Sequence, residues 1–374
     1  MPLLSLIACA AVLQAPIDQP PRLRTILENG AVVLVEKAPG DTATLSLSIS
    51  ADTFPEVPVH NGVRHLLEHL MARGASGDLD LRLETAGGFL RASTYRDAIQ
   101  FEVTIPKSRL DLGFQAIRET LSLGQVAQEQ IAHEAGVLRH EDRLRSIPAK
   151  VSAAAWDKAY EGQAPDPFGN LDVIAATTPK TLIDAHRKMM RGGGVALVAV
   201  GDLDLDETTR KAREILAALP SGNPERVRRG EAKAGSATVE LDSSAAAVSV
   251  PGFDLPSTAA SLMAGLALAS EMEGAWFIYT PAAGPSLMVL GGEGMQKVKV
   301  EGLYRPGRLL ARRWIQTQLQ TPRGIASFRG LLLCQNPALR PETMLEQIDR
   351  VSAAQFEEAV TRYRGEQAIR VVGR

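Results

Sequence analysis

The chain has 374 residues, of which 45% are hydrophobic and 22% charged. This is the composition of an ordinary globular protein with enough length for two domains. The formal net charge is −2 and aromatic residues make up 5%, so neither a field that attracts nucleic acid nor a base-stacking surface is expected. The two cysteines, Cys9 and Cys334, exclude a disulfide framework and a four-cysteine zinc module. Any bound metal must therefore be held by histidine and carboxylate groups.

The N-terminus begins with an apolar run from Leu3 to Leu13, followed by Ala15 and several prolines. This order resembles the hydrophobic region and cleavage zone of a secretion signal. We therefore predict that residues 1–19 are a signal or an N-terminal extension. The predicted location is periplasmic or exported in a bacterium, and a cytoplasmic location is the alternative. No apolar run reaches the roughly 20 residues of a membrane span, so none is predicted.

Residues 24–53 predict two strands around the Pro39-Gly40 turn, because an apolar run precedes the turn and leucine or isoleucine alternates with serine after it. Residues 59–75 predict a helix with Asn61 as its N-cap and Gly74 at its end. Further along, the patterns predict helices within 77–88, 108–121, 127–146 and 206–219, a strand pair in 89–106 and a buried strand in 192–204.

Residues 221–235 combine glycine, proline and dense charge, which is typical of a linker. We interpret the arginines there, Arg226, Arg228 and Arg229, as part of a solvated connector. The second half predicts strands in 236–254 and 277–294, a helix in 256–272, and then two helices and a short strand at the end. Neither half alternates regularly between strand and helix. The sequence therefore predicts an α+β fold of helices on mostly antiparallel sheets, with domains at 20–220 and 236–374.

The stretch VRHLLEHLMARG, residues 63–74, places His65, Glu68 and His69 on one side of the predicted helix. Two imidazoles four residues apart can both reach one zinc ion, whose bonds to nitrogen are about 2.0–2.1 Å long. Glu68 projects to one side, where it can act on a water molecule as a general base. The alternative is an amphipathic helix that happens to carry these residues.

A catalytic zinc ion needs a third protein ligand. The next helix rich in histidine and acid is QIAHEAGVLRHEDRLR, residues 130–145. Its spacing leaves four candidates open, which are His133, Glu134, His140 and Glu141. A pair of surface acids near the arginines of the same helix would explain the pattern equally well.

The inverted order His65-x-x-Glu68-His69 is the motif of the inverzincins, and the acidic helix that follows resembles the pitrilysin and mitochondrial processing peptidase family. The resemblance covers about residues 22–220. It implies that His65, His69 and Glu141 hold one zinc ion per chain, that Glu68 is the general base, and that Glu134 supports the site from behind.

The same resemblance implies that a peptide substrate binds as an added strand along Arg91, Ala92, Ser93 and Thr94. Members of this family usually have asparagine where this chain has Arg91. A basic residue at this position would favour acidic or C-terminal groups of the substrate.

Members of the family have two similar domains, and residues 236–374 look like a shortened, inactive-type second domain. The family's substrate-gripping arginine–tyrosine pair is expected between Leu268 and Tyr279, where no arginine occurs. Tyr279 and the adjacent Tyr304 and Arg305 are the remaining candidates. The resemblance therefore implies a homo- or heterodimer in which a same-fold subunit supplies the pair.

The sequence thus predicts a zinc-dependent endopeptidase that hydrolyses peptides or unfolded segments together with a partner. The alternative is a non-catalytic structural or assembly subunit of the same family. The presence of His65, Glu68, His69 and Glu141 together favours the peptidase.

Overall fold

The structure is a computed structural model that describes residues 20–51, 54, 57–74, 76–223 and 229–373. The predicted signal at residues 1–19 lies outside the described residues. The strands are β1 (Arg22–Ile26), β2 (Val32–Lys37), β3 (Thr42–Ser50), β4 (Phe89–Thr94), β5 (Ala98–Pro106), β6 (Val195–Gly201), β7 (Gly235–Val239), β8 (Ala245–Val250), β9 (Trp276–Tyr279), β10 (Ser286–Gly291) and β11 (Ile369–Gly373).

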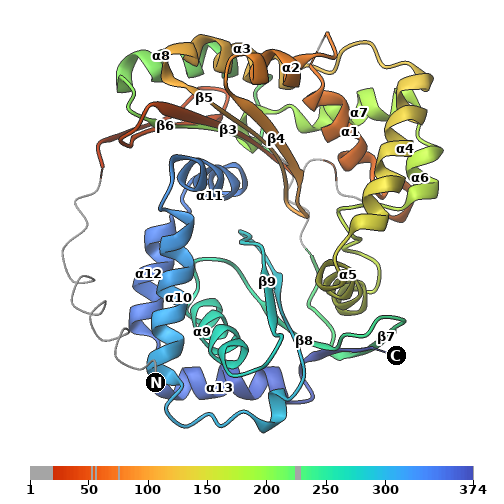
Figure 1. The fold of residues 1–374 in the computed structure, drawn as a ribbon, viewed down its shortest axis with the longest axis vertical. Helices are drawn as coiled ribbons and strands as arrows, with labels where there is room; N and C mark the ends of the chain where they lie inside the picture. The colour runs from red at the N-terminus through yellow and green to blue at the C-terminus, as the bar shows by residue number, and fades with distance from the viewer. Residues whose placement is uncertain (1–19, 52–53, 55–56, 75, 224–228, 374) are drawn as a thin grey trace.

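The helices cover these strands on several sides (Figure 1). They are α1 (Val63–Ala72), α2 (Leu79–Thr85), α3 (Leu110–Thr120), α4 (Gln128–Leu144), α5 (Ile147–Tyr160), α6 (Leu171–Ala175), α7 (Pro179–Met189), α8 (Leu205–Leu216), α9 (Pro256–Ser270), α10 (Tyr304–Gln318), α11 (Pro322–Gln335), α12 (Pro341–Arg350) and α13 (Ala353–Arg364). No helix in the described ranges is both long enough and apolar enough to cross a membrane.

The strands form two sheets, one in each half of the chain. The first has the order β1-β2-β6-β3-β5-β4 and the second the order β7-β11-β8-β10-β9. Among the strands of the described residues, only the pairs β2 with β6 and β7 with β11 run parallel. The second order repeats the last five strands of the first, so the halves share one topology. The predicted α+β fold with two similar, mostly antiparallel layered domains is confirmed.

Several predicted elements differ from the structure. The strands on either side of the Pro39-Gly40 turn form, but they do not pair, because β6 lies between β2 and β3. Helices α5 and α6 were not predicted, and the last part of the chain holds four helices, α10 to α13, instead of two.

The predicted linker is not solvated throughout. Arg229 forms an ion pair with Asp97 and donates a hydrogen bond to the carbonyl oxygen of Pro285 at 2.9 Å. Its guanidinium group also lies 5.1 Å from the centre of the Trp156 ring. Arg226 and Arg228 lie outside the described residues. The interpretation of a solvated connector is therefore wrong for Arg229, which ties the end of this segment to both halves.

The two halves exchange one helix each. The first sheet carries α1, α2, α3 and α8 on its outer face, while α11 from the second half lies against its inner face (Figure 1). Reciprocally, α5 from the first half packs through Val151 and Ala155 on the second sheet, against Leu287 and Val289. Both faces of the central strands of each sheet are therefore covered, and neither half has a complete core without the other.

The exchange also buries the serine face of β3. Alternation of apolar and polar residues usually marks a strand with one solvated face. Here Gln100 donates hydrogen bonds to Ser48 Oγ at 2.8 Å and to the carbonyl oxygen of Ser327 in α11 at 2.9 Å. A side chain at Gly330 would place its Cβ only 2.6 Å from Ser48 Oγ. The polar face of β3 is thus a packing surface for α11.

An ion cluster of Arg22, Glu36, Arg329 and Glu342 reinforces this contact. Arg329 of α11 lies 2.8 Å from carboxylate oxygens of both Glu36 and Glu342, and Arg22 lies 3.0 Å from Glu342. Burial raises the pKa of Glu36. Burial also opposes ionisation of Glu342, but the hydrogen bond and charge of Arg329 outweigh it and lower the pKa of Glu342 to about 2.

The lowered pKa predicts how stability depends on pH. The ionised Glu342 stabilises the fold above its unfolded pKa of 4.5, and this contribution disappears as pH falls towards 2. Its upper limit is about 3 kcal/mol. In urea unfolding, Glu342→Gln should therefore be less stable than the wild type at pH 7, and the difference should shrink by pH 3. Glu346→Gln, an exposed change on the same helix, is the control. A difference that stays constant with pH would contradict the prediction.

Candidate metal centre

The helix that carries the histidine motif begins at a glycine. The N-cap of α1 is Gly62, with a positive φ of 101°, and not the predicted Asn61. A Cβ at Gly62 would lie 2.6 Å from the Ile174 side chain and 3.0 Å from the Cα of Gly169. Asn61 instead donates a hydrogen bond to the carbonyl oxygen of Asp166 at 2.8 Å. The start of α1 is thus held against the loop of residues 164–170.

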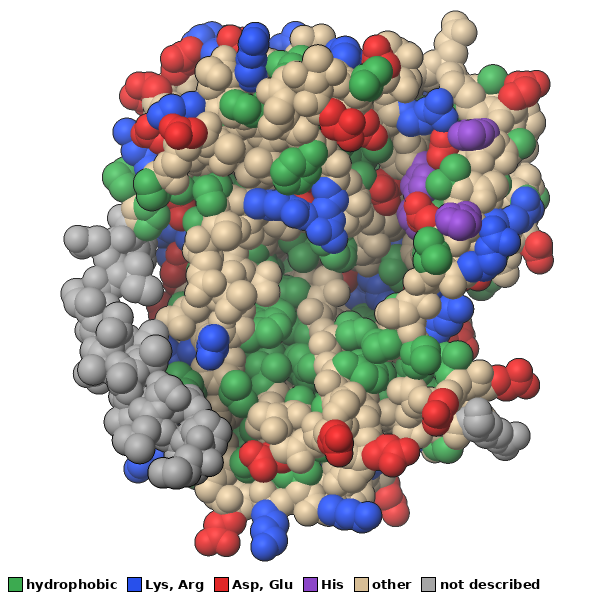
Figure 2. Space-filling model, viewed as in Figure 1, with side chains coloured by type: hydrophobic (Ala, Val, Ile, Leu, Met, Phe, Trp, Pro, Cys, Tyr) green, Lys and Arg blue, Asp and Glu red, His purple; other side chains and the backbone are tan. Residues whose placement is uncertain are grey.

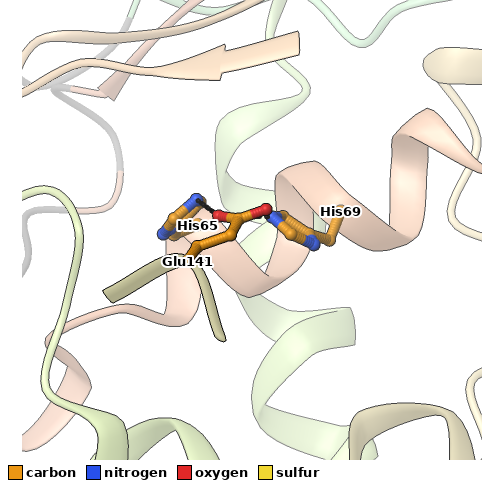
Figure 3. Close-up of side chains that lie close together, drawn as sticks. All are labelled: His65, His69 and Glu141. Carbon is orange, nitrogen blue, oxygen red and sulfur yellow. Dashed lines mark ion pairs between the residues drawn. The ribbon is translucent and has the colours of Figure 1, made fainter. Parts of the chain in front are cut away.

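The two histidines of α1 face a carboxylate of α4. His65 Nε2 and His69 Nε2 lie 3.8 and 3.7 Å from the same oxygen, Oε2 of Glu141 (Figure 3). One donor atom from each of the three residues lies within 4.8 Å of the others. Two helices distant in sequence therefore bring three donors to one point.

The other ring nitrogen of each histidine is also engaged. His65 Nδ1 lies 2.9 Å from the carbonyl oxygen of Phe168, and His69 Nδ1 lies 3.1 Å from Glu134 Oε2. Because a carbonyl oxygen only accepts, His65 Nδ1 must carry the proton, which leaves the Nε2 lone pair free. A hydrogen bond of this kind fixes the tautomer and the ring orientation of a metal-binding histidine.

Arg73 completes the support behind His69 by donating a hydrogen bond to Glu134 Oε1 at 2.6 Å. The hydrogen bonds from His69 and Arg73 lower the pKa of Glu134. For His69, burial lowers the pKa, but the hydrogen bond to Glu134 and the nearby acids outweigh it, so the pKa is raised overall. Glu134 is therefore an ionised anchor for this ring.

Glu68 is buried beside the three donors. Its Oε2 lies 3.9 Å from His65 Nε2 and accepts a hydrogen bond from Thr94 Oγ1 at 2.9 Å. Burial raises the pKa of Glu68 to about 7, against the opposing effects of His69 and Thr94. A divalent cation at the donors would favour the ionised carboxylate.

The four candidates for the third ligand fall into different places. Glu141 points to the histidine nitrogens and Glu134 lies behind His69. His133 and His140 are exposed, and His140 Nδ1 lies 3.3 Å from Arg143. Of the four, only Glu141 belongs to the cluster of donors.

The predicted substrate strand borders the same site. Arg91, Ala92, Ser93 and Thr94 line an open pocket of about 570 Å³ together with the histidines, Glu68 and Glu141. They belong to β4, which is the last strand of the first sheet. One edge of β4 is therefore not paired with another strand in the described part of the chain.

The tyrosines of the second half lie elsewhere. Tyr279 is 8% exposed and packs 5.8 Å from the Trp314 ring, measured between ring centres. Tyr304 donates a hydrogen bond to the carbonyl oxygen of Val351 at 2.6 Å. All residues that line the pocket come from positions 65–168. Neither tyrosine therefore contributes to the site.

Sequence reasoning missed the residues that hold loop 164–170. Arg145, just after α4, forms an ion pair with Asp166, and its guanidinium group lies 4.6 Å from the centre of the Phe168 ring. Arg96 donates hydrogen bonds to the carbonyl oxygens of Ala164, at 2.6 Å, and Pro165. The proline and glycine residues of 164–170 are typical of a loop. They do not indicate what the loop contacts, because contacts between distant segments leave no local pattern.

Comparisons with known proteins agree with this fold. The chain is 26% identical over 215 residues to core protein I of the mitochondrial ubiquinol-cytochrome-c reductase complex of Euglena gracilis, covering 54% of this chain and 43% of that protein. It is 25% identical over 213 residues to the beta subunit of the mitochondrial processing peptidase of Bos taurus, with the same coverage. The matched segment thus spans less than half the length of these relatives.

A crystal structure of a protease from Helicobacter pylori superposes with a TM-score of 0.80 at 16% identity, covering 95% of this chain and 100% of that one. This likeness extends the shared fold through the second half. Residues 31–163 match the insulinase family, which is peptidase family M16. The matched segment includes all four side chains of the site. The chain therefore carries a domain of peptidase family M16.

Proposed function

We propose that this chain is the zinc-bearing subunit of an endopeptidase that hydrolyses peptides or unfolded segments. His65, His69 and Glu141 would hold one zinc ion, and Glu68 would be the general base. The observation that carries the proposal is the convergence of three donors from α1 and α4 beside a buried carboxylate.

The donor set fits zinc. Two imidazoles and one carboxylate leave a fourth position open, as in catalytic zinc sites. Ligand atoms at bond lengths of about 2.0–2.1 Å in a tetrahedral arrangement are about 3.4 Å apart. The distances of 3.7 and 3.8 Å from the Glu141 oxygen to the histidine nitrogens are close to this value. Because the Nδ1 atoms of both histidines are hydrogen-bonded, the imidazole rings would need to move little to bind the ion.

Zinc in such a site supplies Lewis acidity, which polarises a peptide carbonyl group and makes water nucleophilic at neutral pH. The residues of the chain supply the rest. Glu68, oriented by Thr94, takes the proton of the attacking water and returns it to the leaving amine. The free edge of β4 would hold the peptide by backbone hydrogen bonds, which tolerate many sequences.

A partner subunit completes the proposal. Among the described residues, the pocket is lined by the first half, and no side chain of the second half is part of this lining. A same-fold subunit would supply the arginine–tyrosine pair near the scissile carbonyl. The name of the bovine relative, a subunit of a processing peptidase, supports this arrangement.

The second candidate is a structural subunit without catalysis. The name of the Euglena relative, a core protein of a respiratory complex, favours it. A structural role alone gives no reason to keep Glu68 beside three converging donors, each histidine with its own anchor. The peptidase therefore explains more of the site.

Replacing the base tests the mechanism directly. Glu68→Gln removes the proton acceptor but none of the three donors, so zinc content should be unchanged while peptide hydrolysis falls at least about 10²-fold. Metal analysis and a fluorogenic peptide assay measure both. Glu129→Gln, an exposed change in the first turn of α4, should leave both unchanged. Unchanged hydrolysis in Glu68→Gln would remove this residue from the mechanism.

The partner can be tested by reconstitution. Alone, the chain should bind zinc but cleave peptides poorly, because the second half adds no electrostatic contact to the pocket. Addition of a same-fold chain that carries the arginine–tyrosine pair should raise kcat/KM by about 10²-fold or more. Rapid turnover by the single chain, with no gain on mixing, would contradict the partner.

The hydrogen bond behind His65 predicts a role for Arg145 in positioning this ring. Arg145→Met should loosen loop 164–170 and the Phe168 carbonyl group, and so weaken zinc binding about tenfold. Competition with a chelating indicator measures the affinity without relying on hydrolysis. Arg143→Met, an exposed change in the last turn of α4, is the matched control. Equal zinc affinity in both variants would show that Arg145 does not act through the loop.

A further inference from the structure

Side chains of β4 point alternately to two faces of the first sheet. Leu90 and Ala92 pack against the core under the outer helices, and Thr94 reaches Glu68. Phe89 and Arg91 must then point to the opposite face. In agreement with this, Arg323 of α11 lies 5.7 Å from the centre of the Phe89 ring. Arg91 thus faces the hollow between the two halves, which is seen in Figure 2.

This face of β4 has an unbalanced positive charge. Glu102 of β5 lies directly opposite Arg91 in the strand register and is 5% exposed. Its carboxylate is already matched by Arg323, whose Nε and Nη2 both lie 3.2 Å from Glu102 Oε2. Arg91 is exposed, and its guanidinium group makes no ion pair or hydrogen bond within the described ranges. One carboxylate therefore faces two guanidinium groups.

A peptide paired with β4 would place one of its side chains directly across from Arg91. Directly opposed residues of neighbouring strands share a face and interact, and opposite charges stabilise the pair. Arg91 precedes Thr94 by three residues, which is about 10 Å along a strand. The peptide side chain that pairs with Arg91 would therefore be about three residues from the peptide residue next to Glu68, and it would point to the other face of the peptide.

We infer that this chain selects substrates with a carboxylate at the position paired with Arg91. The carboxylate is an aspartate or glutamate side chain or the C-terminus of the peptide. This inference rests on the proposed function, because it requires β4 to be the strand that receives the peptide.

The test measures peptide binding without turnover. The probes are a series of C-terminally amidated peptides without other charged side chains, each with one glutamate at a different position. Each peptide is bound to the zinc-loaded Glu68→Gln chain, and its Kd is measured by fluorescence anisotropy. We expect glutamate to lower Kd about threefold at the peptide position opposite Arg91, or also at positions two residues away from it. Only every second side chain of the bound peptide is on the face of the sheet where Arg91 lies. A parallel series with a free C-terminus distinguishes the terminal carboxylate from the side chain.

Three further substitutions, each made in the Glu68→Gln chain, test whether Arg91 is the residue that recognises the carboxylate. Arg91→Gln should abolish the preference for glutamate, and Arg91→Lys should retain most of it because the charge remains. Arg118→Gln removes a charge from an exposed position on α3 and should change nothing. High salt should weaken the preference, since part-exposed charges are screened.

The outcomes separate this inference from the proposed function. Equal Kd values for all glutamate positions, or a preference that survives Arg91→Gln, would overturn the inference even if the wild type hydrolyses peptides with zinc. Lack of zinc-dependent hydrolysis by the chain mixed with its same-fold partner, together with the expected charge preference, would overturn the peptidase and leave the binding site. Failure of every peptide to bind would overturn the role of β4, and the inference with it.

Discussion

Two hydrogen bonds behind the histidines of α1 determine what the candidate site can do. Without the Phe168 carbonyl group at His65 and the Glu134 carboxylate at His69, either ring could turn or present a protonated nitrogen to the pocket. With them, both Nε2 atoms face Glu141 in a fixed tautomer. The metal affinity proposed for this site would depend on this preorganisation. The anchors come from α4 and from loop 164–170, so the site is a property of the tertiary fold.

The helix exchange explains why such a site can be rigid. Helix α5 follows α4 directly and packs on the second sheet, while α11 of the second half packs on the first. Neither sheet can bury both of its faces unless the other half is in place. The end of α4, with Glu141 and Arg145, is therefore held between two cores. The ion cluster of Arg22, Glu36, Arg329 and Glu342 adds directional contacts to the same junction, at the cost of burying charge.

Local periodicity predicted much of this molecule, and contacts between distant segments account for what it missed. The pattern of the histidine helix and that of the strand pair in 89–106 are local signals, and α1, β4 and β5 formed there as predicted. The sequence did not show that β2 and β3, which flank the Pro39-Gly40 turn, are separated in the sheet by β6, more than 140 residues further along the chain. Spacing alone left His133, Glu134, His140 and Glu141 equivalent. The rotation of α4 against α1, which places Glu141 in the donor cluster, depends on packing that a single sequence does not encode locally.

The two halves of the chain contribute differently to the candidate site, and the second half has a role beyond stabilising the fold. It lends no residue to the lining of the pocket, and its two candidate tyrosines are engaged in its own core. Yet Arg323, near the start of α11, pairs with the buried Glu102 of β5, the strand next to β4. Without that ion pair, Glu102 would attract Arg91 and cancel its charge. Because Arg323 occupies the carboxylate, Arg91 stays free for the proposed substrate. The second half thus contacts the face of β4 that lies opposite to the candidate metal centre.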